Sequence, residues 1–136
     1  MRITADTNVL VRAAVLDDPL QAAHAVELLR NADLIAVTLP ALCEFVWVLG
    51  RGYSRTAAEI FGFIRTLLDS PCVRVDRLAA EAGLVVLAAG GDFADGVIAF
   101  EGRRLGGEIF ASFDRRALEL VAKNGGDTHF PESPAM

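Results

Sequence analysis

Short apolar stretches of strand length alternate with longer segments of helical periodicity along most of this chain, and this alternation constrains the fold more than any other feature. Strands are expected near residues 2–6, 34–38, 72–75 and 108–112. Helices are expected near residues 8–15, 19–31, 40–49, 54–69, 77–89, 93–105 and 115–123. Strands separated by helices pair in parallel and are covered on both faces. The sequence therefore predicts an α/β protein built on a parallel sheet.

Two helix starts carry capping signals. Asp18 before Pro19 predicts an N-cap followed by proline at the first helical position. Ser54 is expected to cap the helix near 54–69. Apolar residues of that helix recur at helical spacing and predict a core-facing stripe, namely Ala57, Ile60, Phe61, Ile64, Leu67 and Leu68. Residues 125–136 have the composition of a tail with room for one short edge strand.

Composition indicates one globular domain over residues 1–136. Hydrophobic residues make up 53% of the chain and charged residues 23%, which excludes a disordered chain. No apolar run approaches the roughly 20 residues of a membrane span, and the N-terminus lacks the pattern of a secretory leader. Cys43 and Cys72 have no framework or ligand spacing, so we expect buried thiols in a cytoplasmic protein.

The net charge of −5 argues against a protein that coats nucleic acid without selectivity, because such proteins rely on positive potential. Of the 13 basic residues only Lys123 is a lysine. Arginine presents a planar fork of donors that suits phosphate, but codon bias is the simpler explanation of the excess. Several arginines near the polar motifs are candidates for phosphate contact: Arg12, Arg51, Arg55, Arg103, Arg104, Arg115 and Arg116.

The stretch "ITADTNVLVRA", residues 3–13, places three polar residues between an apolar strand and the next apolar segment. In an open parallel sheet, sites collect at the carboxyl ends of the strands, and Asp6 follows the first strand at such an end. Aspartate is also a common helix cap, stabilising by about 1 kcal/mol. Asp6 is therefore either a helix cap or a site residue.

Glu44 is the only charge of the helix "PALCEFVWVLG", which is apolar nearly all round. A helix that is apolar on every side is expected to be buried. An ionised carboxylate buried there costs several kcal/mol unless it is paired or binds a metal. Glu44 is thus expected to bind a metal ion or to pair with an arginine from elsewhere in the chain.

Asp92 and Asp95 lie in "GGDFADGVIAFEG" at a spacing that places both carboxylates in the first turn of one helix. Capping and the helix dipole account for one acid at such a place. The second, Asp95, lies beside Ala94, Gly96 and Ala99, small residues that allow close approach of another element or a ligand. We interpret Asp95 as a site residue. Asp92 is either a helix cap or a site residue.

Asp114 follows the expected strand "EIFAS" and precedes a helix, so it repeats the position of Asp6, although by itself it resembles an N-cap. In a parallel sheet these chain positions can converge on one edge. Several carboxylates close together repel and are stable in the ionised state only around a cation. Oxygen ligands suit Mg²⁺ or Mn²⁺, whose natural chemistry is phosphodiester hydrolysis by activated water. His24 and His129 have no ligand-like partners, and no phosphate-cradling glycine loop is present.

These motifs, in this order, resemble the PIN-domain ribonucleases, and most closely the VapC-type toxins of bacterial toxin–antitoxin pairs. The four stretches that carry the resemblance are "ADTNVLVR", "LCEFVWVL", "ADGVIAF" preceded by "GDF", and "ASFD". The acids of the family's motifs correspond to Asp6, Glu44, Asp95 and Asp114, with Asp92 as an acid often found there. Thr7, Asn8 and Ser112 match polar positions that support the acids in the family.

The resemblance implies a three-layer α/β/α sandwich on a parallel sheet of four to five strands. It implies an endoribonuclease in which Asp6, Glu44 and Asp95 bind Mg²⁺ or Mn²⁺, with Asp92 and Asp114 as further ligands or water-positioning groups. It also implies a homodimer and a small VapB-like antitoxin as partner. RNA would be cut to leave a 5′-phosphate and a 3′-hydroxyl.

Three other interpretations are considered. A receiver or phosphatase-like domain also gathers acids at strand ends, but it needs a phosphate-binding lysine, and Lys123 lies at a helix end where it serves the helix dipole. A catalytically silent partner-binding module is disfavoured because all the acids are present. A PIN nuclease in RNA processing, without a toxin role, stays open.

Overall fold

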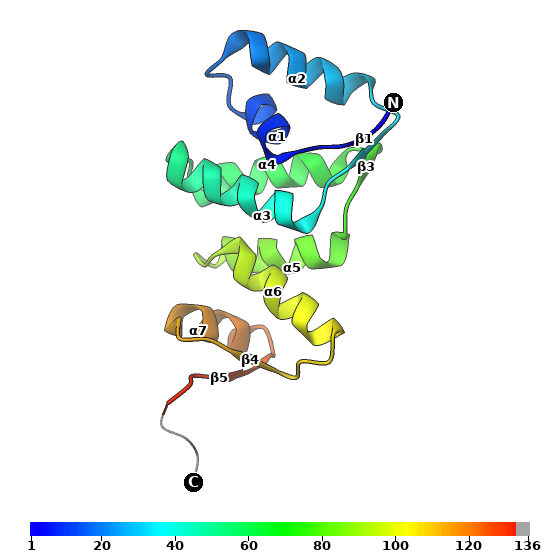
Figure 1. Cartoon of the computed structure of the whole chain (residues 1–136). Coiled ribbons are helices and arrows are strands. Elements are labelled where there is room, and N and C mark those ends of the chain that lie inside the picture. Colours follow the sequence, from blue (N-terminus) through cyan, green and yellow to red (C-terminus); the bar gives the residue numbers. More distant parts are fainter. Residues whose placement is uncertain (133–136) are drawn as a thin grey trace. The chain divides into compact units, whose positions relative to one another are not determined.

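The computed structural model describes residues 1–132, and the chain divides into two compact units that are described separately. Unit 1 runs from Met1 to Arg77, and unit 2 begins at Leu78. Figure 1 shows that each unit contains both helices and short strands. Residues 133–136, at the end of the expected tail, lie outside the described part of the chain.

Unit 1 contains a three-stranded parallel sheet in the order β1-β2-β3. Its elements are β1 (Arg2–Thr4), α1 (Thr7–Ala14), α2 (Pro19–Asn31), β2 (Leu34–Ala36), α3 (Leu39–Trp47), the π-helical turn η1 (Val48–Gly52), α4 (Ala57–Asp69) and β3 (Val73–Arg74). The register pairs Ile35 of β2 with Ile3 on one side and Val73 on the other. Helix α1 packs against both α2 and α3 (Figure 1).

The core of unit 1 is apolar and almost free of solvent. Its largest fully buried side chains are Leu42, Phe45, Leu49, Ile64 and Leu68. The predicted stripe of α4 is confirmed in its central positions, Ile60, Ile64 and Leu68, which are buried at helical spacing. Ala57 at the start of α4 is exposed, so the stripe is narrower than the sequence predicts.

The two predicted caps have different outcomes. The Asp18 carboxylate accepts a hydrogen bond from the Gln21 N–H, and Pro19 opens α2, as predicted. The prediction for Ser54 is wrong: α4 is capped by Thr56, which accepts from the Glu59 N–H. The Glu59 carboxylate accepts from the Thr56 N–H in return, which completes a capping box. Ser54 instead has a left-handed backbone with φ of 52°.

We predict that Thr56→Ala lowers the free energy of unfolding by about 1 kcal/mol, because it removes the side-chain acceptor of the capping box. Ser54→Gly is the matched control and should leave stability equal or higher, because glycine adopts a positive φ without strain. Urea unfolding of both variants measures the difference. Equal stability of Thr56→Ala and the unchanged protein would contradict the assigned cap.

Unit 2 contains a two-stranded parallel sheet of its own, with Phe110 of β4 opposite Thr128 of β5. Its elements are α5 (Arg77–Ala88), α6 (Phe93–Arg104), β4 (Ile109–Ala111), α7 (Arg115–Lys123) and β5 (Asp127–His129). Helix α7 packs against α6 and against both strands. The strand expected within the tail is therefore present as β5.

Glycines allow α5 and α6 to approach closely. A Cβ built on Gly96 of α6 would lie 2.4 Å from the Ala82 carbonyl oxygen and 2.8 Å from the Gly83 Cα. A Cβ on Gly83 would lie 2.6 Å from the ring of Phe93, which is fully buried. The expectation that the small residues beside Asp95 permit close approach of another element is confirmed at Gly96.

The predicted α/β class with parallel strands is confirmed, and the observed helices and strands fall close to the predicted ranges. The strands form two hydrogen-bonded sheets, and the single domain over 1–136 stays a prediction. Cys43 and Cys72 are only half-buried, so the expectation of buried thiols is wrong. Within residues 1–132 no helix is both long enough and apolar enough to cross a membrane.

Candidate functional site

The first candidate, Asp6, lies at the junction between β1 and α1. The preceding residue, Ala5, is buried, and its N–H donates to the Ala36 carbonyl beside it. Asp6 occupies the N-cap position of α1 with an extended backbone, yet its exposed side chain makes no capping hydrogen bond. The Asp6 carboxylate therefore does not cap α1. Both of its oxygens stay available to a ligand.

Thr7 connects the Asp6 junction to the helix that carries Glu44. Thr7 is buried with 7% exposure, and its hydroxyl donates to the Ala41 carbonyl of α3 over a long 3.5 Å. The N–H of Ala41 is itself capped by the Thr38 hydroxyl at 3.3 Å. Asn8 is exposed in the first turn of α1. Because the Thr7 hydroxyl bonds to α3 and not to Asp6, the supporting roles of Thr7 and Asn8 both stay predictions.

Glu44 is exposed, and the expectation that its helix is buried on every side is wrong. Helix α3 buries Ala41, Leu42, Phe45 and Val46, and these residues form one face. The opposite face, with Glu44 and the 63% exposed Trp47, is open to solvent. The exposed carboxylate needs no compensating partner, and within unit 1 it forms no ion pair. The ligand role of Glu44 therefore rests on the resemblance alone.

Asp92 and Asp114 both cap helices of unit 2. The Asp92 carboxylate accepts from the Ala94 N–H at 3.1 Å, at the start of α6. The Asp114 carboxylate accepts from the N–H groups of Arg116 and Ala117 at 3.0 and 3.1 Å, at the start of α7. Each acid uses only its Oδ1 atom for capping. The capping roles are confirmed, and in each case Oδ2 stays available for a second role.

Ser112 holds the turn that presents Asp114. Its Oγ accepts a hydrogen bond from the Asp114 N–H at 2.9 Å. Its own N–H donates to the His129 carbonyl, which extends the pairing of β4 with β5 by one residue. The hydroxyl predicted to support the last acid therefore does so through the backbone of that acid.

Asp95 is half-buried in the first turn of α6. Burial raises the pKa of the Asp95 carboxyl, and the negative charges of Asp92 and then Asp114 raise it further. The charges of Asp92 and Asp114 thus disfavour the ionised form of Asp95, and a cation near Asp95 would favour it. This charge environment suits a divalent ion.

The five acids do not all belong to one unit. Asp6 and Glu44 lie in unit 1, and Asp92, Asp95 and Asp114 lie in unit 2. Over its described residues, neither unit alone groups three or more Asp, Glu, His or Cys side chains closely enough to hold a metal ion. The convergence of these acids on one metal site stays a prediction, which their shared oxygen chemistry supports.

The raised pKa of Asp95 predicts how the stability of the fold depends on pH. Above that pKa the ionised carboxylate destabilises the fold, and this penalty is lost as the pH falls below the pKa of an unfolded aspartate, about 3.9. In EDTA we expect Asp95→Asn to have a higher Tm than the unchanged protein at pH 7. The gap should close as the pH approaches 4, which thermal unfolding at several pH values measures. A gap that stays constant with pH would contradict the assignment.

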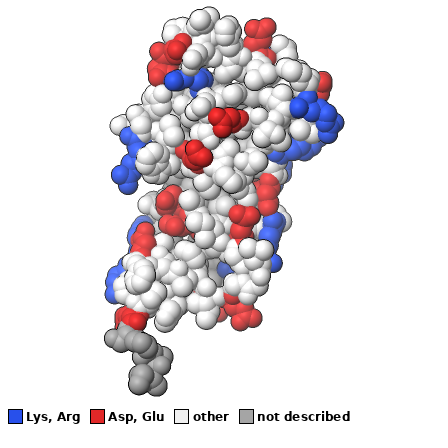
Figure 2. All heavy atoms as spheres, in the orientation of Figure 1, with Lys and Arg blue, Asp and Glu red and all other residues white. Residues whose placement is uncertain are grey.

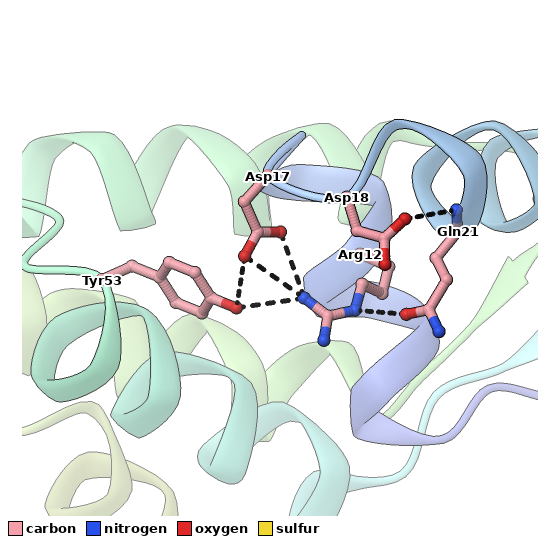
Figure 3. Close-up of polar contacts among 5 residues, drawn as sticks. All are labelled: Arg12, Asp17, Asp18, Gln21 and Tyr53. Carbon is pink, nitrogen blue, oxygen red and sulfur yellow. Dashed lines mark hydrogen bonds and ion pairs between the residues drawn. The ribbon is translucent and has the colours of Figure 1, made fainter.

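Arg12 is held in a polar network of unit 1 and is not a free phosphate donor (Figure 3). Its Nη1 donates to the Tyr53 hydroxyl and to the Asp17 carboxylate, both at 3.1 Å. The Tyr53 hydroxyl donates onward to Asp17, and the Arg12 Nε donates to the Gln21 side chain at 2.7 Å. The network connects Tyr53, which follows η1, to α1 and to the start of α2. The sequence did not predict this structural role of Arg12.

Other candidate arginines also have partners. Arg55 pairs with Glu59, while Arg116 donates to the Ala89 carbonyl and pairs with Glu119. Arg115 lies over the ring of Phe130. Figure 2 shows acidic and basic side chains interspersed on the visible face.

Comparison with known proteins gives one result. A family model described as "PIN domain" matches residues 3–124, a range that contains every candidate acid. No curated protein matches the chain closely enough to count as a relative.

Proposed function

Because this chain belongs to the PIN-domain family, whose members are generally nucleases, we propose that it is a metal-dependent endoribonuclease that hydrolyses RNA phosphodiester bonds. The single observation that carries the proposal is the burial of Asp95 together with the neighbouring negative charges. Its carboxylate is half-buried and is repelled by Asp92 and Asp114, an arrangement that a divalent cation would stabilise. The uncommitted carboxylate of Asp6 at a strand end supports the same conclusion.

The residues proposed to hold Mg²⁺ or Mn²⁺ are Asp6, Glu44 and Asp95. When bound, the ion would supply charge stabilisation at the phosphate and activation of water. Asp92 and Asp114 would accept hydrogen bonds from water through Oδ2, because Oδ1 of each is used by a helix N-terminus. Since these acids orient water and no side chain is needed as nucleophile, the expected products carry a 5′-phosphate and a 3′-hydroxyl.

The proposal is tested by incubating the purified chain with total bacterial RNA in Mg²⁺, Mn²⁺ or EDTA. We expect discrete fragments with 5′-phosphate ends that vanish in EDTA. Fragments that end in 2′,3′-cyclic phosphate would contradict this scheme, because they indicate attack by the 2′-hydroxyl of the RNA itself. Such products would form without the water that the acids are proposed to orient.

We further propose that this nuclease is a VapC-type toxin that acts in the cytoplasm as a homodimer and is blocked by a small VapB-like antitoxin. The order of the four motifs supports this role, as does a groove along α2 whose lining includes Leu16, Pro19, Ala22 and Val26. Leu16 and Leu20 are exposed, as apolar residues at a partner interface are in the absence of the partner. The alternatives are a PIN nuclease of RNA processing and a silent binding module.

A growth assay separates these roles. Expression of the chain in bacteria should arrest growth, and co-expression of a small protein encoded beside it should restore growth. Growth arrest that no neighbouring gene relieves would contradict the toxin–antitoxin assignment. If the chain cuts RNA but does not affect growth, the RNA-processing role replaces the toxin role.

A further inference from the structure

Two phenylalanines and one arginine form an exposed aromatic cluster beside Asp114, which we call the aromatic platform (Phe113, Phe130 and Arg115). Phe113 and Phe130 pack edge to face, with ring centroids 5.7 Å apart and an interplanar angle of 85°. The Arg115 guanidinium lies 3.8 Å from the centroid of the Phe130 ring. Phe113 is nevertheless 74% exposed, so most of its ring is open to a ligand.

The backbone on both sides of the aromatic platform is held in place. Phe113 lies between Ser112, which is bonded to the His129 carbonyl, and Asp114, which caps α7. Phe130 directly follows β5, whose last residue, His129, pairs with Ala111 of β4. A ligand that contacts Phe113 therefore meets a turn that is already ordered, which lowers the entropic cost of binding.

The negative charge of the chain favours an uncharged contact with RNA, such as base stacking, at the aromatic platform. The chain carries a net charge of −5, and the negative charges of Asp92 and Asp114 both act on Asp95. A phosphate backbone gains little from such surroundings, whereas base stacking on an aromatic ring does not depend on net charge. Arg115 adds one positive charge at the edge of the aromatic platform.

We propose that Phe113, supported by Phe130 and Arg115, is a substrate-binding residue that stacks an unpaired base of the RNA beside Asp114. The proposal rests on the proposed nuclease function and adds a residue that positions its substrate. A paired base is stacked within its own helix and has no free face to offer, while bases in loops and single strands do. The ring is placed next in sequence to an acid of the candidate site, so the stacked base would lie near the bond to be cut.

The test measures the binding of a fluorescent single-stranded oligoribonucleotide in Mg²⁺, with Asp95→Asn as the common background so that the RNA stays intact. Phe113→Ala should raise the Kd by about 5- to 100-fold, and Phe113→Trp should keep the Kd near that of the background. Leu105→Ala is the matched control, because Leu105 is 89% exposed in the same unit, and it should leave the Kd unchanged. Binding of duplex RNA should be the same in all four proteins.

Cleavage kinetics in the otherwise unchanged protein complete the test. Phe113→Ala should raise KM for single-stranded RNA by a similar factor. If the unchanged protein cuts RNA and Phe113→Ala binds and cuts as well as it does, base stacking is wrong while the proposed function stands. Equal losses on single-stranded and duplex RNA would also overturn the proposal, as would an effect on self-association alone. If the unchanged protein neither binds nor cuts RNA, both the proposed function and the stacking are wrong.

Discussion

Asp95→Asn is expected to lower kcat/KM for RNA cleavage by at least about 100-fold while the protein stays folded. A loss of 10- to 100-fold is typical when even a residue that supports a metal ligand is replaced. Asparagine keeps the size of the side chain but lacks the charge that binds a cation. The fold should not suffer, because burial and the charges of Asp92 and Asp114 already disfavour the ionised Asp95.

Activity and Tm measured on the same preparation separate a loss of catalysis from a loss of folding. Asp69→Asn is the matched control, because Asp69 is an exposed aspartate at the end of α4, outside the candidate site, and this variant should keep full activity. We expect loss of cleavage with an equal or higher Tm for Asp95→Asn. Full activity of Asp95→Asn would exclude it as a ligand, and loss of activity together with a collapse of the fold would assign it a structural role.

Gly96→Ala is expected to lower the free energy of unfolding by about 2–3 kcal/mol, although alanine normally favours a helix over glycine by about 1 kcal/mol. The added Cβ would lie 2.4 Å from the Ala82 carbonyl oxygen, far inside van der Waals contact. The obstacle is backbone of α5, which cannot rotate away as a flexible side chain can. The two helices would have to separate, and the turn that carries Asp95 would move with α6.

Gly102→Ala in the same helix provides the control. A Cβ at Gly102 meets no atom within 4 Å, so this variant should be equally stable or gain up to about 1 kcal/mol. Urea unfolding of the two variants measures the contrast. Equal stability of Gly96→Ala and Gly102→Ala would contradict the close packing of α5 on α6.

The sequence predicts helices and strands well here, because periodicity is a local property that each segment expresses by itself. The wrong N-cap prediction at Ser54 could have been avoided from the local sequence. Ser54 and Thr56 are both cap-forming residues, but only Thr56 has a glutamate three residues later, and the reciprocal bond with Glu59 decides between them. The division of the strands into two sheets depends on distant pairings that no segment encodes alone.

The candidate site was predicted less completely. The sequence indicates acids at strand ends but does not indicate how their oxygens are used, since Asp92 and Asp114 cap helices and Asp6 does not. The exposure of Glu44 could not be predicted, because the exposed Trp47 makes the open face of α3 look apolar. Phe113 was missed because an isolated phenylalanine in sequence predicts a core residue, whereas the ring is 74% exposed in the structure.

The most direct test of the account is a titration of the purified chain with Mn²⁺, followed by calorimetry, with RNA cleavage measured on the same sample. We expect saturable binding of Mn²⁺ that is weakened in Asp95→Asn, together with RNA cleavage that requires the ion. A folded chain that binds no Mn²⁺ and cuts no RNA would contradict the proposed function. The carboxylates would then be helix caps and solvated charges, and the chain a binding module with the PIN fold.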